Sequence, residues 1–114
     1  MSDAALSSLD EASYHPRLAA TPGIALVLFG SPECGGCRVA ERRLPSAAPP
    51  GTSLFKVDVR QATGLARALD IFHLPELLLY RDGHFHARLR CEISAAALAS
   101  ALHAALSRPA EEEP

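Results

Sequence analysis

The 114 residues carry a formal net charge of −2, from 11 basic and 13 acidic side chains. A chain of this length with 48% hydrophobic residues has room for one domain with a single core. The balance of charges excludes a non-specific nucleic-acid binder, because such a protein needs an excess of Lys and Arg to neutralise phosphates. No stretch of the sequence is long and apolar enough to span a membrane.

The start of the chain bears on its location. Its first residues lack the basic beginning and the continuous apolar core of a secretory signal. We therefore expect a cytoplasmic protein, in which reducing conditions favour catalytic or metal-binding cysteines over structural ones. The sequence has three cysteines, and an odd number excludes complete pairing within the chain.

The first part of the chain predicts a strand, a helix and a second strand. A weak strand signal covers residues 4–6. Ser8 and Glu11 have the spacing of a capping box, which predicts a helix that begins near Leu9. Residues 24–29 contain no polar side chain, which is typical of a central strand buried on both faces.

A helix, a strand and a shorter helix are predicted next. An apolar stripe that includes Cys37 and Leu44 predicts the first of these helices, and Pro45 is expected to end it. Residues 54–59 alternate with an apolar bias, as a strand does, and residues 64–69 have the spacing of a short helix. Alternation of strands and helices favours parallel pairing with helices that cover the sheet.

The sequence then predicts a β-hairpin. Residues 77–80 and 85–89 flank Asp82-Gly83, a pair that favours a tight two-residue turn. Regular alternation along the second strand would leave His84 and His86 on an exposed face.

A last helix and a short tail complete the chain. Ser94 is a capping residue for a helix with a leucine-rich and alanine-rich stripe. We expect one domain over residues 1–108 and an acidic, disordered tail over residues 109–114.

The segment Cys34-Gly35-Gly36-Cys37 lies where the buried strand is expected to pass into a helix. Unpaired backbone N–H groups and the helix dipole stabilise a thiolate at such a position, so a dithiol there suits redox exchange. Zinc sites share this cysteine spacing but usually use a second cysteine pair, and the chain has none. Two buried, inert thiols are the alternative.

This order of elements resembles thioredoxin and its relatives over about residues 6–107. The dithiol follows a buried strand, Lys56 and Asp58 lie on the next strand, and Pro75 opens the hairpin, as in that family. The resemblance implies an α/β fold: a single thioredoxin-like domain in which a central mixed β-sheet is flanked by helices.

The resemblance also implies a thiol–disulfide oxidoreductase that acts as a reductant of protein disulfides. Cys34 would attack the partner disulfide as a thiolate, and Cys37 would resolve the mixed disulfide. An upstream reductase would then reset the dithiol, and neither a metal nor an organic cofactor is required. We expect a monomer without nucleic-acid or membrane partners.

Four residues would shape the substrate site by the same resemblance. Gly35 and Gly36 form the turn between the two thiols. Pro75 is expected to have a cis peptide bond and to lie against the dithiol, and the backbone of Leu74 would pair with an incoming peptide strand.

The sequence departs from the family inside the sheet. Thioredoxins usually have an aspartate that assists proton transfer at the resolving cysteine, and Leu28 occupies that position here. Lys56, the usual companion of that aspartate, is left without it and would turn outward or find another acceptor. Deprotonation of Cys37 would then be slower, or solvent or Glu41 would substitute.

The immediate surroundings of the dithiol also differ. Gly30 and Glu33 occupy the places of the two tryptophans that flank the family motif. The charge of Glu33 opposes thiolate formation at Cys34, whereas the helix end and Arg38 favour it.

A third thiol adds an alternative function. Cys91 falls where the family commonly has a glycine, and it is either a small buried residue or a peripheral thiol able to form a disulfide. With His73 and the dithiol cysteines Cys34 and Cys37 it would also make a metal-binding set. The alternative to an enzyme is therefore a thioredoxin-fold binding or redox-sensing module with little turnover.

Overall fold

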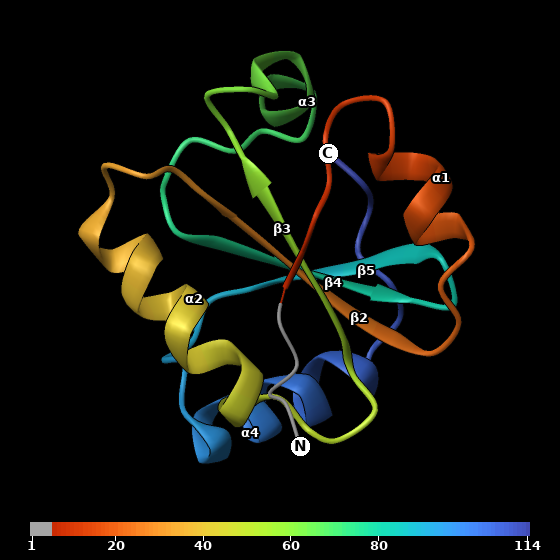
Figure 1. The fold of residues 1–114 in the computed structure, drawn as a ribbon. Helices are drawn as coiled ribbons and strands as arrows, with labels where there is room; N and C mark the ends of the chain where they lie inside the picture. Colours follow the sequence, from red (N-terminus) through yellow and green to blue (C-terminus); the bar gives the residue numbers. More distant parts are fainter. Residues whose placement is uncertain (1–5) are drawn as a thin grey trace.

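A computed structural model, which describes residues 6–114, shows a five-stranded sheet with helices on both faces (Figure 1). The predicted α/β fold with a central mixed sheet is confirmed. The elements are β1 (Ser7–Ser8), α1 (Tyr14–Ala19), β2 (Ile24–Gly30), α2 (Gly35–Ala47), β3 (Ser53–Asp58), α3 (Thr63–Ala68), β4 (Glu76–Arg81), β5 (His84–Leu89) and α4 (Ala95–Leu106). Residues 4 and 5 of the expected first strand lie outside the described residues.

The strand order is β1-β3-β2-β4-β5, which places β2 at the centre. β2 pairs in parallel with β3 and antiparallel with β4, so both of its edges are hydrogen-bonded. In the parallel pair Gly30 lies opposite Asp58. The chain therefore leaves β2 and β3 at the same edge of the sheet, and the dithiol follows there.

Two apolar layers cover the sheet. Figure 1 shows α1 and α3 on one side and α2 and α4 on the other. Along β2, Val27 and Phe29 pack in the first layer, while Leu26 and Leu28 pack in the second. Successive strand residues point to opposite faces, so a strand without polar side chains fills both layers. The largest fully buried side chains are Tyr14, Phe29, Leu18, Leu26, Leu44, Leu78, Leu79, Leu98, Val27 and Val57.

The first helix begins later than the predicted capping box, which is wrong because Ser8 belongs to β1. Asp10 and Ser13 form the reciprocal pair instead. The Ser13 N–H donates to Asp10 Oδ1 (2.8 Å) and the Asp10 N–H donates to Ser13 Oγ (3.0 Å). The bond from the Ser13 N–H lowers the pKa of Asp10. Glu11 has a different role, because its carboxylate accepts from the Leu65 N–H (2.9 Å) in α3.

α2 continues through Pro45, so the prediction that this proline ends the helix is wrong. A proline removes one N–H and therefore one hydrogen bond, to the carbonyl four residues earlier. The next turn still closes, because the Ala48 N–H donates to the Leu44 carbonyl (2.9 Å). Pro45 lies in the last turn of α2, where the loss of one bond is tolerated.

The hairpin turn forms as predicted, since Asp82 and Gly83 both have positive φ angles, 51° and 83°. The prediction that His86 is exposed is wrong. A register shift between Leu79 and Tyr80 inserts an extra residue in β5, which turns His86 inward. His86 is 7% exposed, and its Nε2 lies 2.8 Å from the carbonyl oxygen of Ala105 in α4.

The tail over residues 109–114 is exposed but makes contact with the sheet. The Glu111 N–H donates to the His86 carbonyl (2.7 Å), and its carboxylate accepts from the Arg88 N–H (3.1 Å). These bonds use the outer edge of β5, where backbone groups lack a neighbouring strand. Within residues 6–114 no helix is long and apolar enough to cross a membrane.

Gly83 tests the hairpin packing. We expect Gly83→Ala to lower the free energy of unfolding by about 2–4 kcal/mol. The added Cβ would lie 2.9 Å from the Ala19 carbonyl oxygen, in addition to the strain of a positive φ. Gly51→Ala is the matched control, because Gly51 also has a positive φ (87°) but no atom lies within 4 Å of the added Cβ. It should cost about 1 kcal/mol. Equal losses in urea unfolding would contradict the close contact with α1.

Candidate active site

The dithiol lies at the start of α2, and Cys34 is the capping residue of that helix. Its backbone is extended (φ −85°, ψ 108°), and its Sγ accepts a hydrogen bond from the Cys37 N–H (3.1 Å). A capping side chain faces the N–H groups that have no partner inside the helix. The Cys34 sulfur is therefore held where backbone dipoles stabilise negative charge.

Cys34 and Cys37 form a disulfide, with their Cα atoms 5.2 Å apart. Cys34 is partly exposed, whereas Cys37 is 4% exposed. A partner protein can therefore reach Cys34 but not Cys37. This difference in access favours Cys34 as the attacking thiol and Cys37 as the resolving one.

Cys37 packs closely against Gly30, the last residue of β2. A Cβ on Gly30 would lie 2.8 Å from Cys37 Cβ and 3.0 Å from Cys37 Sγ. A side chain on the last residue of β2 would therefore force Cys37 and the start of α2 to shift.

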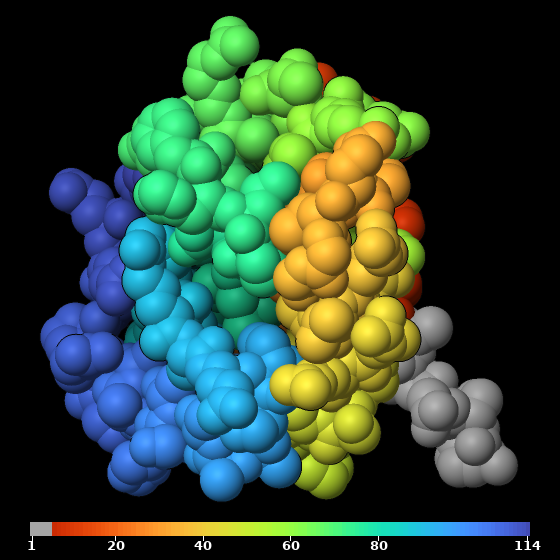
Figure 2. All heavy atoms as spheres, turned by 90° about the vertical axis from the view of Figure 1, so that its left-hand side faces the viewer, coloured from red at the N-terminus to blue at the C-terminus, as the bar shows by residue number. Residues whose placement is uncertain are grey.

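Pro75 lies against the turn between the cysteines. A Cβ on Gly36 would lie 3.6 Å from Pro75 Cδ, which is ordinary contact distance. The Leu74–Pro75 peptide bond is cis. Figure 2 shows the orange start of α2 beside the teal segment that contains Pro75, with a groove between them.

A pocket of about 550 Å³ lies behind Cys37, between α2 and the β1–β3 side of the sheet. Leu28 and Cys37 line it together with the polar side chains of Glu41 and Lys56. Lys56 Nζ lies 2.6 Å from Glu41 Oε2. Lys56 thus has a hydrogen-bond acceptor on α2. The Leu28 side chain, which is apolar, provides no proton acceptor in the pocket.

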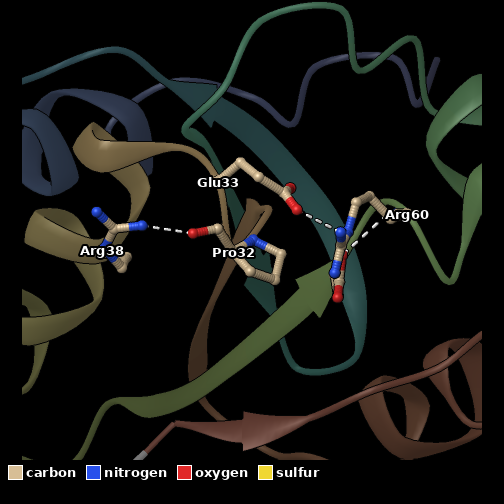
Figure 3. A network of polar contacts seen from close by, with 5 residues as sticks. Pro32, Glu33, Arg38 and Arg60 are labelled. Atoms are coloured by element: carbon tan, nitrogen blue, oxygen red, sulfur yellow. Dashed lines mark hydrogen bonds and ion pairs between the residues drawn. The ribbon is translucent and has the colours of Figure 1, made fainter.

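A network of charges lies at the entrance to α2 (Figure 3). The Glu33 carboxylate pairs with the guanidinium of Arg60, which also lies 3.8 Å from Asp58 Oδ1. Arg38 donates to the Pro32 carbonyl. The negative charge of Glu33, next to the dithiol, is therefore balanced by Arg60, which reaches it from the loop after β3.

Arg60 was not predicted from the sequence as a residue of the site. The structure reveals it through the parallel pairing of β2 with β3, which places the residues after Asp58 beside those after Gly30. Without the register, no pattern in the sequence connects Arg60 with Glu33.

Glu76, the residue after Pro75, was also missed. It is 5% exposed, and its Oε2 lies 3.1 Å from Arg88 Nη1. Arg88 Nη2 in turn donates to the Leu69 carbonyl (2.9 Å) at the end of α3. This largely buried pair joins β4 to β5, and Glu76 lines a hollow that Pro75 also lines. A lone acidic residue before four apolar ones was its only signal.

Cys91 and His73 lie on a second hollow, of about 240 Å³, which Pro75 also lines. Leu28 lines both hollows, whereas Cys37 lines only the first and Cys91 only the second. In the part of the chain from residue 6 onward, no three His, Cys, Asp or Glu side chains come together as a metal site. The described structure thus does not bring Cys34, Cys37, Cys91 and His73 together as a metal-binding set.

Comparisons with known proteins identify the family of this domain. The family model for thioredoxin matches residues 5–104. No curated protein sequence matches the chain.

Solved structures share the fold. The zinc-bound form of human ERp44 superposes with a TM-score of 0.73 at 23% identity, over 90% of this chain and 30% of that one. Form I of human ERp44 gives a TM-score of 0.73 at 23% identity, over 91% of this chain and 30% of that one. A chain from a study of thiol resolution in yeast mitochondrial 1-Cys peroxiredoxin gives 0.67 at 17% identity, over 77% of this chain and 86% of that one. This chain thus spans about a third of the ERp44 chains that it matches.

The close approach at Gly30 yields a test. We expect Gly30→Ala to lower the free energy of unfolding by about 1–3 kcal/mol, because the new Cβ overlaps Cys37. Gly35→Ala is the control in the same loop, since no atom lies within 4 Å of its added Cβ. It should stay within about 0.5 kcal/mol of the parent protein. A Gly30→Ala protein as stable as Gly35→Ala in urea unfolding would contradict the packing of β2 on Cys37.

The environment of Cys91 predicts its reactivity. Burial raises the pKa of the Cys91 thiol, so less thiolate is present at neutral pH than in an exposed cysteine. In the oxidised protein we expect iodoacetamide to modify Cys91 slowly at pH 7, with a rate that keeps rising above the pH range of an ordinary thiol. Mass spectrometry measures the rate, and the urea-unfolded chain is the control. Equal rates in the folded and unfolded chains would contradict the partial burial of the Cys91 thiol.

Proposed function

This chain is a member of the thioredoxin family, and on that premise we propose that it is a thiol–disulfide oxidoreductase that reduces disulfides in protein substrates. The observation that carries the proposal is the pairing of a partly exposed Cys34 at a helix start with a buried Cys37 in disulfide contact. The Cys34 sulfur is accessible to the substrate, whereas the Cys37 sulfur is shielded from other reactions until the mixed disulfide has formed.

The reaction has two exchanges. The Cys34 thiolate attacks one sulfur of the partner disulfide, a mixed disulfide forms, and the other partner sulfur leaves as a thiolate. Cys37 then loses its proton and attacks the Cys34 sulfur, which releases the second partner thiolate. The partner gains two electrons and two protons, and Cys34–Cys37 becomes the disulfide seen in the structure. An upstream reductase restores the dithiol.

The direction of electron flow follows from the cytoplasmic location that we propose, where the thiol pool is reducing. On this chain the electrons are carried by the two sulfurs, so the exchange requires neither a metal nor an organic cofactor. The protein would act as a monomer, with disulfide-containing proteins and a reductase as its partners.

The groove beside Pro75 would receive the substrate. Pro75 Cδ lies 3.6 Å from the position that a Cβ on Gly36 would take, and the adjoining backbone of Leu74 would offer N–H and C=O groups to an extended peptide. Pairing of this kind depends on backbone rather than side chains, so it would admit many sequences around the substrate disulfide.

Trapping tests the function. We expect Cys37→Ser to accumulate mixed disulfides between Cys34 and protein substrates, because the resolving thiol is absent. Cys34→Ser is the matched control and should trap little, since Cys37 is buried. Non-reducing gels and mass spectrometry detect the adducts. An inert Cys34 with no trapped partner and no insulin reduction by the unmodified protein would overturn the proposal in favour of a binding module.

A further inference from the structure

The second exchange requires a base near a buried sulfur. Cys37 is 4% exposed, and its thiol has to lose a proton before it can attack the mixed disulfide. Bulk solvent reaches Cys34 but not Cys37 directly. The pocket of about 550 Å³ behind Cys37 is the open space that adjoins this residue and also holds ionisable groups.

Glu41 is well placed among those groups. It follows Cys37 by four residues on α2, so both side chains lie on the same face of the helix, about one turn apart. Both line the pocket. Lys56, on β3, holds the Glu41 carboxylate in place through an ion pair in which Lys56 Nζ lies 2.6 Å from Glu41 Oε2. The Glu41 side chain remains 43% exposed and so keeps access to water.

The other charged groups that line the pocket have different partners. Asp10, from the segment after β1, accepts from the Ser13 N–H. Asp58, at the end of β3, accepts from the Arg60 N–H (3.0 Å). Arg38, on α2, donates to the Pro32 carbonyl.

We propose that Glu41 accepts the Cys37 proton through water in this pocket, with Lys56 as a positioning residue. This inference rests on the proposed oxidoreductase function. The Cys37 S–H bond breaks, the proton passes by way of water to the Glu41 carboxylate, and the electron pair stays on sulfur. The thiolate then bonds to the Cys34 sulfur, the bond from Cys34 to the partner breaks, and the partner thiolate leaves. Glu41 returns the proton to solvent, and no outside oxidant is needed.

Charge alone predicts the opposite effect of removing Glu41. Loss of its negative charge would leave Lys56 unpaired near Cys37, and a nearby cation favours a thiolate. A purely electrostatic role therefore predicts faster resolution in Glu41→Gln. A role as proton acceptor predicts slower resolution, so the sign of the change separates the two.

The experiment follows the two exchanges separately. The reduced protein, in a Cys91→Ser background, is mixed in stopped flow with a limiting amount of dithiobis(nitrobenzoate), which releases a coloured thiol at each exchange. We expect Glu41→Gln to leave the first release unchanged and to slow the second by roughly tenfold or more at neutral pH, at the lower end of general-base effects. The difference should shrink as the pH rises, because hydroxide then takes the proton.

Matched variants complete the test. Asp10→Asn removes another carboxylate that lines the pocket, keeps a side-chain oxygen for the Ser13 N–H, and should leave the second release unchanged. Glu41→Asp keeps the acceptor and should retain more of the rate than Glu41→Gln. Lys56→Met should slow the second release and alter its pH profile, whereas Lys56→Arg should restore both.

The outcomes distinguish two failures. A second release in Glu41→Gln that is as fast as, or faster than, that of the parent across the pH range would overturn the inference and leave the oxidoreductase intact. Absence of the first release in the parent protein would overturn the proposed function itself. Thermal melting of each variant identifies a folding defect. If Glu41→Gln is unfolded, the rate of the second release in Glu41→Asp is compared with that of the parent protein instead.

Discussion

The parallel pairing of β2 with β3 is the constraint on which the site depends. Its register sets Gly30 opposite Asp58, so the segments that leave both strands lie side by side at one edge of the sheet. The dithiol follows one strand and Arg60 follows the other, which lets Arg60 reach Glu33 (Figure 3). A slip of one residue would turn the two charged side chains of β3, Lys56 and Asp58, toward the apolar layer beneath α1 and α3. The hydrophobic pattern of two strands thus fixes which charges surround the dithiol.

The position of the acidic group behind Cys37 follows from the same layers. A carboxylate at Leu28, which is 3% exposed, would lose almost all of its hydration and would need a buried partner. Glu41 lies at the margin of the pocket, where it keeps part of its hydration and still meets Lys56. As a partly exposed ion pair this contact adds little to stability. Its consequence is to hold a proton-accepting oxygen in a pocket that Cys37 lines.

Elements that depend on one local sequence pattern were predicted correctly. The prediction was wrong where a local pattern was overridden by a long-range feature of the sheet. The apolar run of β2 and the Asp82-Gly83 turn have the expected structure because each has one favourable solution. His86 lies in a polar–apolar alternation that is typical of an exposed face. A bulge in β5 turns it toward α4, and no periodic sequence pattern marks the position of a bulge. The site behaves likewise. The dithiol was predictable from its local setting, whereas Arg60 was not, because its contact depends on strand register.

The surroundings of Cys34 show why these long-range contacts matter for chemistry. Glu33 alone would oppose a thiolate at Cys34, but Arg60 balances its charge from the end of β3. Both side chains of that pair are more than half exposed, so salt and water weaken its field. The N–H groups at the start of α2 are fixed by the helix itself, and one of them donates to Cys34 Sγ. Once Glu33 is balanced, the backbone rather than the charged side chains determines how readily Cys34 becomes a nucleophile.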